Sequence, residues 1–341
     1  MRKHFLKMLQ VSKSWIVLPL LTVIAVATFI WKKNRHTYVR VGRIKKILFY
    51  PVKSLKGIEL SEAECTESGF VVHGLYERSF MLMTKDLKLL SQCEAPKLSL
   101  LTPKFVDSKL VICGPNSDTL TLSIDSVPNK NHEIIEYCMK YRFLGVISCV
   151  VDCGDHASRW FQSYLSMPDI RLVRFFPDFP KRNLTWIPSF FSKLKKINPK
   201  DLQDLAAVHL MSQSSIDDLN SRLVDRRVSH INFRPNILVD ECAPFAEDSW
   251  HYMKLGNQCE MERVIPVARC LMTTMEPEKG ILTQNEPMVT LRKYRIPRDP
   301  KILQITGAIP CFGQACFLLR TGTIKLQDDI FATITKPFDT V

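Results

Sequence analysis

Short apolar runs separated by turn residues fill residues 44–124 of the chain. One run ends at Pro51, and others cover residues 78–83, 109–113 and 119–124, with Gly, Pro, Asn, Ser and Asp between them. Runs of this kind, bounded by these residue types, are typical of strands joined in hairpins and meanders. The pattern predicts a β-rich segment.

Helical spacing begins at Asp155, a residue type that caps helix N-termini. Apolar residues then recur at three- and four-residue intervals, namely Ala157, Trp160, Phe161, Tyr164 and Leu165. This spacing predicts a helix with one buried face. A second helix is predicted to start near Ser214 or Ser215, with an apolar face made of Ile216, Leu219 and Leu223.

Strand patterns return at residues 170–175 and 236–239 and in C-terminal hairpins around Gly313 and Gly322. Residues 177–200 are rich in Pro and basic residues, as loops and linkers are, and we place a domain boundary there. The predicted fold is α+β and mainly β. An anchor and linker would occupy residues 1–41, and two β-rich parts would occupy residues 42–176 and 177–341.

Residues 14–31 carry no charged side chain and are rich in Leu, Ile, Val and Ala, with Trp15 and Trp31 near the edges. As a helix the segment would be about 27 Å long, close to the hydrocarbon thickness of a bilayer. Trp side chains favour the membrane interface, and basic residues flank both ends. The segment is therefore predicted to be a transmembrane anchor.

The alternative for this segment is a cleaved signal peptide, because residues 25–27 (Ala-Val-Ala) match the small-residue pattern of cleavage sites. Against cleavage, the apolar run continues to Trp31 and then meets Lys32 and Lys33. Seven basic residues follow the span up to residue 46 and four precede it. This asymmetry favours a C-terminal body on the cytosolic side.

The distribution of charge narrows the classes of partner. The net charge is +13, but residues 1–46 hold eleven Lys or Arg and no Asp or Glu. The rest of the chain has 36 basic and 34 acidic residues. A nucleic-acid-binding surface spread over the body is therefore not expected.

The cysteine pattern favours a reducing compartment. The chain has 11 cysteines, an odd number, and no two have the C-x-x-C spacing. Neither a disulfide framework nor a zinc ribbon is therefore predicted. Motifs for phosphate-binding loops, dinucleotide binding, serine hydrolysis and zinc proteolysis are also missing from the sequence.

Three polar clusters are candidates for ligand binding. Lys53 and Ser54 follow a strand end, and Arg78 begins an apolar strand. Arg234 and Asn236 lie at the start of another strand. Cationic and hydroxyl groups of this kind hold anionic ligands, although each alone is more commonly a solvated or ion-paired side chain.

Cys270 lies in an apolar run directly after Arg269. A cysteine in such a run is usually a small core residue. A neighbouring cation, however, favours the thiolate, which is the form that binds metal or attacks carbon. Both interpretations are consistent with the local sequence.

Motifs in a fixed order resemble one protein family. They are P-V-K-S-L-K-G at 51–57, S-E-A-E-C-T at 61–66, V-D-C-G at 151–154, D-D-L-N-S-R-L at 217–223, N-F-R-P-N-I at 232–237, P-C-F-G-Q at 310–314 and G-T-I-K at 322–325. With the segment around Cys270, they make residues 42–335 similar to the mitochondrial amidoxime-reducing components, which are membrane-anchored MOSC-domain proteins. The resemblance implies a β-rich MOSC N-terminal subdomain and a barrel-like MOSC domain enclosing a molybdenum–pterin cofactor.

The resemblance also implies roles for individual residues. Cys270 would be the catalytic thiolate bound to molybdenum, because a soft ligand suits a metal that cycles through two electrons. The residues implied to bind the molybdenum cofactor (Mo-molybdopterin) are Lys53, Ser54, Arg78, Asp204, Arg234, Asn236 and Arg269. Of these, Asn236 and Arg269 would act from behind the others, by supporting the residues that contact the cofactor. Several cations would converge on the anionic pterin phosphate, with no carboxylate among them.

Three segments depart from the family pattern. Asp204 is followed by residues 205–207 (Leu-Ala-Ala), where hydroxyl residues are usual. Residues 91–93 (Ser-Gln-Cys) lack an Arg that is frequent there, and residues 327–329 (Gln-Asp-Asp) replace a Gly-Asp turn. The first departure affects the expected pterin contacts and the substrate pocket.

By resemblance, the expected activity is two-electron reduction of N-hydroxylated compounds such as amidoximes and hydroxylamines. Cytochrome b5 and its flavin reductase would supply electrons, and the expected location is the outer mitochondrial membrane, single-pass, with the body in the cytosol. One alternative is a non-reductase MOSC protein that handles or sulfurates molybdenum cofactor. Another is a non-catalytic membrane scaffold, against which the joint presence of Lys53, Arg78, Arg234 and Cys270 argues.

Overall fold

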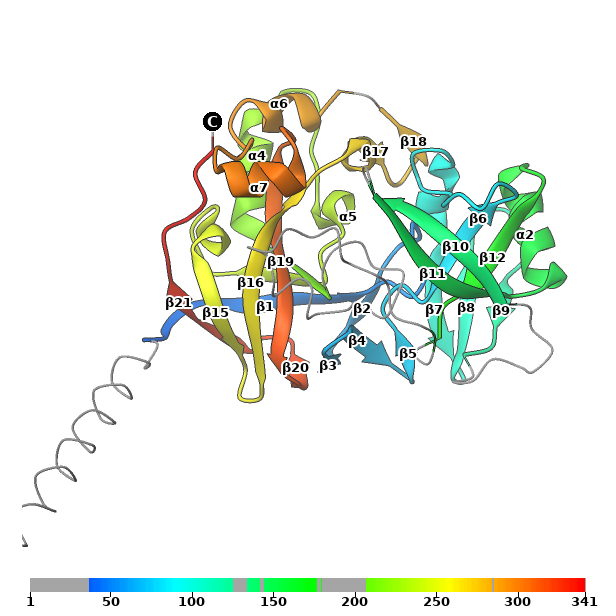
Figure 1. Cartoon of the computed structure of the whole chain (residues 1–341), viewed down its shortest axis with the longest axis horizontal. Coiled ribbons are helices and arrows are strands. Elements are labelled where there is room, and N and C mark those ends of the chain that lie inside the picture. The colour runs from blue at the N-terminus through cyan, green and yellow to red at the C-terminus, as the bar shows by residue number, and fades with distance from the viewer. Residues whose placement is uncertain are drawn as a thin grey trace, which may run out of the picture. The chain divides into compact units, whose positions relative to one another are not determined.

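The structure is a computed structural model of the chain (Figure 1) that describes residues 37–124, 134–141, 144–176, 179, 207–283 and 285–340. Residues 39–341 form one compact unit, called the body below. Within the described ranges, no helix is both long and apolar enough to cross a membrane. The predicted anchor at residues 14–31 lies outside the described residues, and so does the predicted linker at residues 177–200 apart from Phe179.

A closed barrel of seven strands forms the core of the body. In order around the barrel, the strands are β1 (Val39–Phe49), β14 (Ile237–Asp240), β13 (Val208–Ser212), β19 (Cys311–Arg320), β16 (Cys259–Ala268), β15 (Trp250–Leu255) and β21 (Asp329–Ile334). Antiparallel pairing of β1 with β14 and with β21 closes the ring, and β2 (Ile58–Leu60) extends from β1. The expected mainly β fold with a barrel-like domain is confirmed.

Strand β1 brings the start of the described chain into this barrel. Ile44 and Ile47 are both fully buried although they are three residues apart, and strict alternation would place them on opposite faces. A bulge between Ile44 and Lys46 in the pairing with β14 corrects the alternation. The first strand of the segment predicted as a separate subdomain, residues 42–176, is therefore a wall of the C-terminal barrel.

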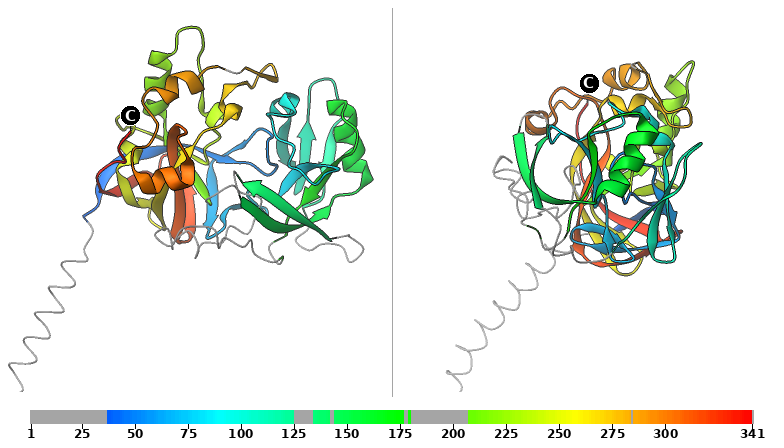
Figure 2. Two further views of the ribbon diagram at one scale, coloured as in Figure 1. Left: turned by 45° about the horizontal axis from the view of Figure 1, so that its top comes forward. Right: turned by 90° about the vertical axis from the view of Figure 1, so that its right-hand side faces the viewer.

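Four smaller sheets accompany the barrel in the described residues, and three of them have three or four strands. One contains β3 (Glu62–Thr66), β4 (Gly69–Val72), β5 (Leu75–Tyr76) and β20 (Gly322–Lys325), the second β7 (Thr102–Val106), β8 (Lys109–Cys113) and β9 (Leu120–Leu122), and the third β6 (Phe80–Thr84), β10 (Ile134–Tyr141), β11 (Leu144–Asp152) and β12 (Ile170–Arg174). The third sheet lies at the opposite end of the body from β15 and β21 (Figures 1 and 2). The predicted meander is confirmed by these sheets.

The predicted helices are present, with different caps. Helix α2 (Asp155–Leu165) has Gly154 at its N-cap, so Asp155 is the first helical residue rather than the cap. Helix α4 (Gln213–Arg222) is capped by Ser212, whose side chain accepts a hydrogen bond from the Ser215 amide. Short helices complete the body, namely α5 (His230–Phe233), α6 (Met288–Arg292), α7 (Pro300–Thr306), η1 (Pro96–Leu100), η3 (Ala246–Asp248) and η4 (Leu271–Thr274). The fourth small sheet pairs β17 (Met275–Glu276) with β18 (Ile281–Leu282).

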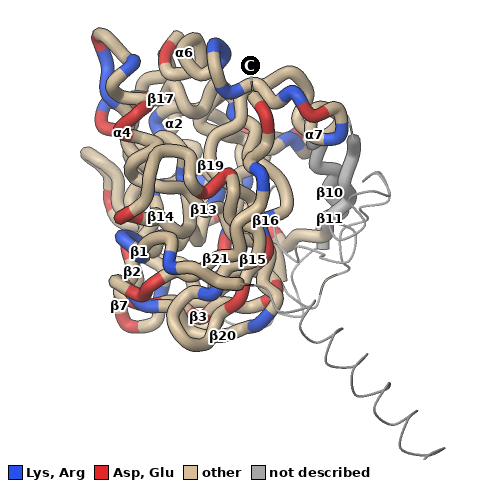
Figure 3. Tube along the Cα trace, turned by 90° about the vertical axis from the view of Figure 1, so that its left-hand side faces the viewer, with Lys and Arg blue, Asp and Glu red and all other residues tan. Residues whose placement is uncertain are grey.

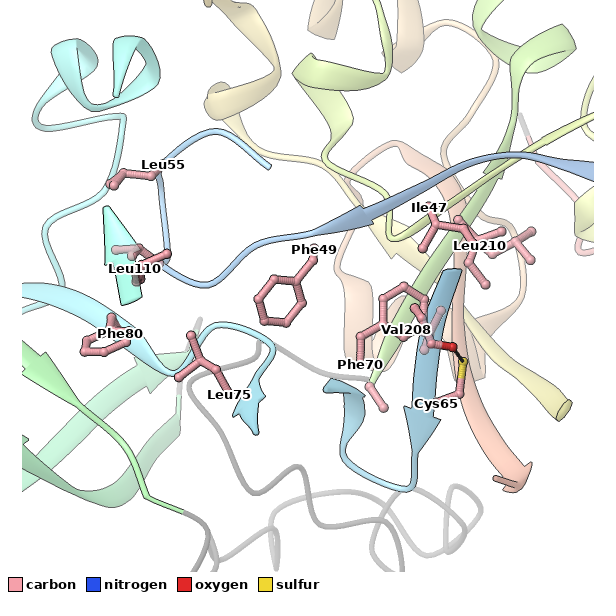
Figure 4. Close-up of a cluster of buried hydrophobic side chains, with 14 of the residues drawn as sticks. Ile47, Phe49, Leu55, Cys65, Phe70, Leu75, Phe80, Leu110, Val208 and Leu210 are labelled. Atoms are coloured by element: carbon pink, nitrogen blue, oxygen red, sulfur yellow. Dashed lines mark hydrogen bonds between the residues drawn. The ribbon is translucent and has the colours of Figure 1, made fainter. Parts of the chain in front are cut away.

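One continuous hydrophobic core connects the barrel to the smaller sheets. Ile47, Val208 and Leu210 from the barrel belong to the same cluster as Leu75 and Phe80, and Figure 4 shows Phe49 between these two groups. Burial of each such side chain stabilises the fold by about 1.5–3 kcal/mol. The packing therefore fixes the loops that leave β1 and precede β6, which carry candidate site residues.

The basic residues of β1 lie beside acidic residues. Arg40 and Arg43 contact Glu241 and Asp329, Lys45 contacts Asp240 at 2.9 Å, and Lys46 contacts Glu59 at 2.5 Å. We call these eight residues the β1 charge ladder. Figure 3 shows blue and red segments interspersed over this side of the body.

Candidate functional site

A cavity of about 160 Å³ lies where the barrel meets the loops after β1 and before β6. Its polar lining comes from six separate segments and consists of Lys53, Ser54, Arg78, His209, Asn232, Arg234, Arg269, Cys270, Thr273 and Thr306. Apolar residues from β13, α5, β16, η4, α7 and β19 complete the wall. Lys53, Ser54, Arg78, Arg234, Arg269 and Cys270 were predicted from the sequence as site residues, and the fold brings all six to this cavity.

The loop after β1 runs beside the start of β6. The Arg78 amide donates to the Tyr50 carbonyl at 2.7 Å, the Phe80 amide donates to Pro51 at 3.1 Å, and the Lys53 amide donates to Phe80 at 2.7 Å. These backbone bonds fix the two segments against each other. They explain how Lys53 and Ser54 come to lie on the same cavity wall as Arg78, more than twenty residues away in sequence.

Three cavity residues adopt the left-handed backbone conformation. Their φ angles are 71° at Ser54, 53° at Arg78 and 57° at Arg234. A residue other than Gly in this region costs roughly 1–2 kcal/mol, and such residues cluster at ligand sites when the surrounding fold holds them there. Their convergence on one cavity supports a binding role for it.

Tyr50 lies beneath the two arginines. The Arg234 guanidinium is 4.3 Å from the centre of the Tyr50 ring and that of Arg78 is 5.6 Å away. Burial raises the pKa of Tyr50 to about 12, so its hydroxyl stays protonated at physiological pH. The ring holds both cations by cation–π contact, and Arg234 also donates to the Leu55 carbonyl.

Glu77 is a fully buried carboxylate beside these arginines. Its Oε2 accepts the Tyr50 amide at 2.9 Å, and its Oε1 is 3.6 Å from Arg78 Nε. Burial raises the pKa of Glu77, while Arg78 and the Tyr50 amide oppose the rise. We expected no carboxylate among the converging cations. That expectation is wrong, because the Glu77 carboxyl group lies beside Arg78.

Arg269 is held by backbone carbonyls and by a histidine. Its Nε donates to Phe312 O at 2.8 Å and its Nη1 to Phe233 O at 3.1 Å, while Nη2 lies 2.6 Å from His209 Nε2. Because a guanidinium only donates, His209 Nε2 is the acceptor. The imidazole therefore carries its proton on Nδ1, which donates to the Arg234 carbonyl at 3.3 Å.

Burial lowers the pKa of His209 well below its ordinary value, and the neighbouring charge of Arg269 lowers it further. His209 is therefore neutral at physiological pH. In this state it links Arg269 on one side to the backbone of Arg234 on the other. The histidine joins the two halves of the cavity wall.

Gly313 permits this arrangement. It was predicted as a hairpin residue, but it lies within β19, with φ of 78°. A Cβ atom there would lie 2.5 Å from His209 Nε2 and 3.0 Å from the Leu210 carbonyl. Only glycine lets β19 pass this close to the His209–Arg269 pair.

Cys270 is exposed and lies just after β16, at the N-cap of η4. Its carbonyl accepts the amide of Thr273 at 3.1 Å and the hydroxyl of Thr273 at 2.9 Å. The Asn232 side chain donates to the carbonyls of Thr273 and Met275 at 3.2 and 2.8 Å. The turn that presents the thiol is thus anchored at both ends, and an accessible thiol is not the small core residue that the local sequence also allowed.

Two predicted site residues are not in the cavity lining, and for Asn236 this agrees with its predicted place behind the others. Asn236 does not line the cavity: its Oδ1 accepts the His209 amide at 3.0 Å and its Nδ2 donates to Leu48 at 3.2 Å, so it connects β13 to β1 behind the wall. Asp204 lies outside the described residues. His209 and Glu77 were not predicted, because neither belongs to a motif, although Glu77 directly precedes Arg78.

Two domain families match the chain in succession. The MOSC N-terminal beta barrel domain family matches residues 41–168, and the MOSC domain family matches residues 199–331. The body thus contains both parts that the sequence motifs imply.

Full-length relatives match most of the chain. It is 33% identical over 315 residues to mitochondrial amidoxime-reducing component 1 of Mus musculus. The aligned residues cover 91% of this chain and 89% of that protein. Component 1 of Homo sapiens is 32% identical over 319 residues (91% and 90% covered), and component 2 of Rattus norvegicus is 31% identical over 318 residues (92% and 91% covered). The chain therefore belongs to the family of mitochondrial amidoxime-reducing components, with a MOSC N-terminal domain and a MOSC domain.

Proposed function

We propose that this protein is a molybdenum-cofactor oxidoreductase that reduces N-hydroxylated compounds, such as amidoximes and hydroxylamines, by two electrons. The relatives are named for amidoxime reduction. The observation that carries the proposal is that the exposed Cys270 lines the same cavity as Lys53, Arg78 and Arg234. A soft metal ligand and anion-binding cations meet there in one site.

The residues present fit a cofactor with a metal at one end and a phosphate at the other. Ser54 Oγ is buried and has no hydrogen-bond partner among the described residues, and an orphaned hydroxyl of this kind is suited to a ligand oxygen. Arginine and lysine donors match phosphate oxygens. A thiolate is a suitable ligand for a redox-active metal.

Each residue would then have a distinct role. Cys270 would hold the metal, while Lys53, Ser54, Arg78 and Arg234 would bind the pterin and its phosphate. Arg269 and Asn236 would keep the walls in place through His209, and Asp204 would make the cofactor contact that the family resemblance implies. When bound, the molybdenum cofactor supplies the two-electron reduction that removes the N-hydroxyl oxygen as water.

The anchor and the electron donors complete the proposal. Residues 14–31 would span the outer mitochondrial membrane once, with the body in the cytosol. Cytochrome b5 and its flavin reductase would supply electrons, and a shared membrane surface would raise the effective concentration of these donors at the body. The mitochondrial part of this location agrees with the names of the relatives.

An activity assay tests the proposal. Purified full-length protein, loaded with cofactor and mixed with cytochrome b5, its reductase and NADH, should convert an amidoxime to the amidine. Cys270→Ser should reduce nothing, whereas Cys113→Ser, which removes a half-buried thiol on β8, should retain full activity. Full activity of Cys270→Ser would refute the assignment. A loaded wild type that reduces no N-hydroxylated compound would favour the alternative of a cofactor-handling protein.

A further inference from the structure

Arg226 makes four polar contacts with a part of the chain that is distant in sequence. It lies half-buried in the segment between α4 and α5. Its Nη1 is 2.9 Å from the Thr274 carbonyl, 2.7 Å from the Thr283 hydroxyl and 2.8 Å from the Glu286 carbonyl. Its Nη2 donates to the Met275 carbonyl. One guanidinium thus connects the two ends of the β17–β18 hairpin.

The oxygens that Arg226 contacts are neutral, namely three backbone carbonyls and one hydroxyl. Moving a charged group out of water toward neutral acceptors is costly. A guanidinium presents its donors in a rigid planar fork, whereas a lysine ammonium is a point charge on a flexible stem. The contacts of Arg226 therefore point to the orientation of the chain rather than to the neutralisation of charge.

These contacts act on the turn that carries Cys270. Asn232 donates to the first and last of the three carbonyls at residues 273–275, and Arg226 donates to the second and last. Three successive carbonyls are therefore held by side chains from residues 226–232. The same turn, η4, has Cys270 at its N-cap and contributes Met272 to the cavity lining.

We propose that Arg226 is a positioning residue that fixes the direction in which Cys270 is presented to the cavity. Its importance for catalysis rests on the proposed function, in which Cys270 holds the metal. Arg226 does not line the cavity, so it acts through the turn. Metal ligands have to be held within about 0.5 Å of the productive geometry. Loss of a group that supports a ligand commonly lowers metal affinity or activity by about 10–100-fold.

Arg226→Lys tests the proposal, and Arg227→Lys is the matched control. Arg227 is exposed, and its Nη1 donates to the carbonyls of Leu223 and Arg226, which belong to its own segment, at 2.8 Å each. Both substitutions keep the charge, but only Arg226→Lys removes the planar donors that reach the turn. Thr283→Val, which removes the hydroxyl that Arg226 contacts, is a milder variant that keeps the test decisive if Arg226→Lys does not fold.

Hydrogen exchange of the full-length, cofactor-free protein is the first measurement. The Thr273 amide donates to the Cys270 carbonyl within the turn, so its exchange rate reports how firmly the turn is held. This amide should exchange about tenfold faster in Arg226→Lys than in the wild type. Thr283→Val should show a smaller increase and Arg227→Lys none. Exchange at the wild-type rate in both Arg226→Lys and Thr283→Val would overturn the proposal.

The kinetics of cofactor-loaded protein distinguish positioning from a merely structural role. Rates are expressed per molybdenum, and the substrate is an amidoxime. Arg226→Lys should lower kcat by about 10–100-fold and leave KM within about twofold, because the geometry at the metal changes and substrate binding does not. Arg227→Lys should match the wild type in both constants. A wild-type kcat in Arg226→Lys would overturn the proposal, even with faster exchange.

Failure of this proposal and failure of the proposed function are distinguishable, because the exchange measurement requires neither molybdenum nor activity. An active wild type with an indistinguishable Arg226→Lys would refute only the role of Arg226. Faster exchange in Arg226→Lys beside an inactive, loaded wild type would leave the ordering of the Cys270 turn established and refute only the reductase assignment.

Discussion

Two basic regions of the body, the β1 charge ladder and the cavity wall, hold their cations in different ways. In the ladder, the partly or fully exposed side chains of Arg40, Arg43, Lys45 and Lys46 contact carboxylates from β2, β14, β21 and the turn after β14. In the wall, Arg234 and Arg269 are buried and donate to backbone carbonyls, and both lie over aromatic rings. The first arrangement neutralises charge at the surface, and the second orients guanidinium groups inside a cavity.

The difference shows that the number of basic residues in a segment does not identify a binding site. Exposed ion pairs contribute little to stability. Buried guanidinium groups are costly to desolvate and persist where the surrounding structure holds them. The wall is therefore the region where substitutions should have large and specific effects.

The largest effect is expected at Gly313, behind the wall. Gly313→Ala should lower the free energy of unfolding by about 3 kcal/mol, because its Cβ would add a steric clash with His209 to the strain of a left-handed residue. Gly74→Ala is the matched control, because Gly74 has nearly the same φ, 77°, but nothing within 4 Å of its Cβ position. It should cost only about 1–2 kcal/mol. Urea unfolding measures both, and equal values would contradict the close-approach explanation.

The next largest effect is expected for Arg234→Ala, on the affinity for the cofactor. Charge-assisted hydrogen bonds contribute about 1.5–3 kcal/mol, so loss of this guanidinium should reduce cofactor affinity by about 10–100-fold. Arg40→Ala in the ladder should leave cofactor affinity unchanged. Molybdenum content after dilution and gel filtration measures the retained cofactor. A similar loss in both variants would mean that general charge, rather than the oriented wall, attracts the cofactor.

A smaller effect on the free energy of unfolding is expected when the pH is lowered, because of His209. The pKa of folded His209 is lowered by burial and by Arg269, whereas the unfolded value is about 6.5. The unfolded chain therefore binds a proton that the folded protein excludes, and the stability is complete above about pH 6.5 and lost as the pH falls toward the folded pKa. His209→Gln should remove this contribution, which has a slope of at most about 1.4 kcal/mol per pH unit. The free energy of unfolding is measured for the wild type and for His209→Gln between about pH 7.5 and 5.5. The same pH dependence in both proteins would contradict the account, because folded His209 would then take up its proton as the unfolded chain does.

The smallest effect is expected in the ladder. Lys45 lies 2.9 Å from Asp240 and lowers the pKa of that carboxyl. Because both side chains are more than a third exposed, Lys45→Ala should change the free energy of unfolding by less than about 1 kcal/mol, and by less again in high salt. Thermal unfolding at two salt concentrations measures this. A large, salt-independent loss would give the ladder a structural role equal to that of the wall.

The sequence predicted most of the strands because their apolar runs are short and clearly bounded. β8 matches its predicted bounds, and the apolar face of α2 is buried at Ala157, Phe161 and Leu165. The closure of the barrel by β1 was not predictable from the local pattern. It depends on pairing with β14 and β21, which are about two hundred residues away or more.

The site was predicted where residues belong to motifs and was missed where their role is set by burial. Lys53, Arg78 and Cys270 were identified by family resemblance, and the fold brings them to one cavity. His209 and Glu77 function through contacts that exist only in the folded state: one with Arg269, the other with Arg78 and the Tyr50 amide. The clash that makes Gly313 indispensable likewise involves a strand distant in sequence.

Metal analysis tests the central claim most directly. Full-length wild type and Cys270→Ser are produced in a host that makes molybdopterin, purified in parallel and analysed for molybdenum per chain. The wild type should carry close to one molybdenum per chain, and Cys270→Ser should carry almost none while unfolding at the same temperature. Wild type without molybdenum, or Cys270→Ser with as much as the wild type, would contradict the assignment of Cys270 as the metal ligand of this cavity.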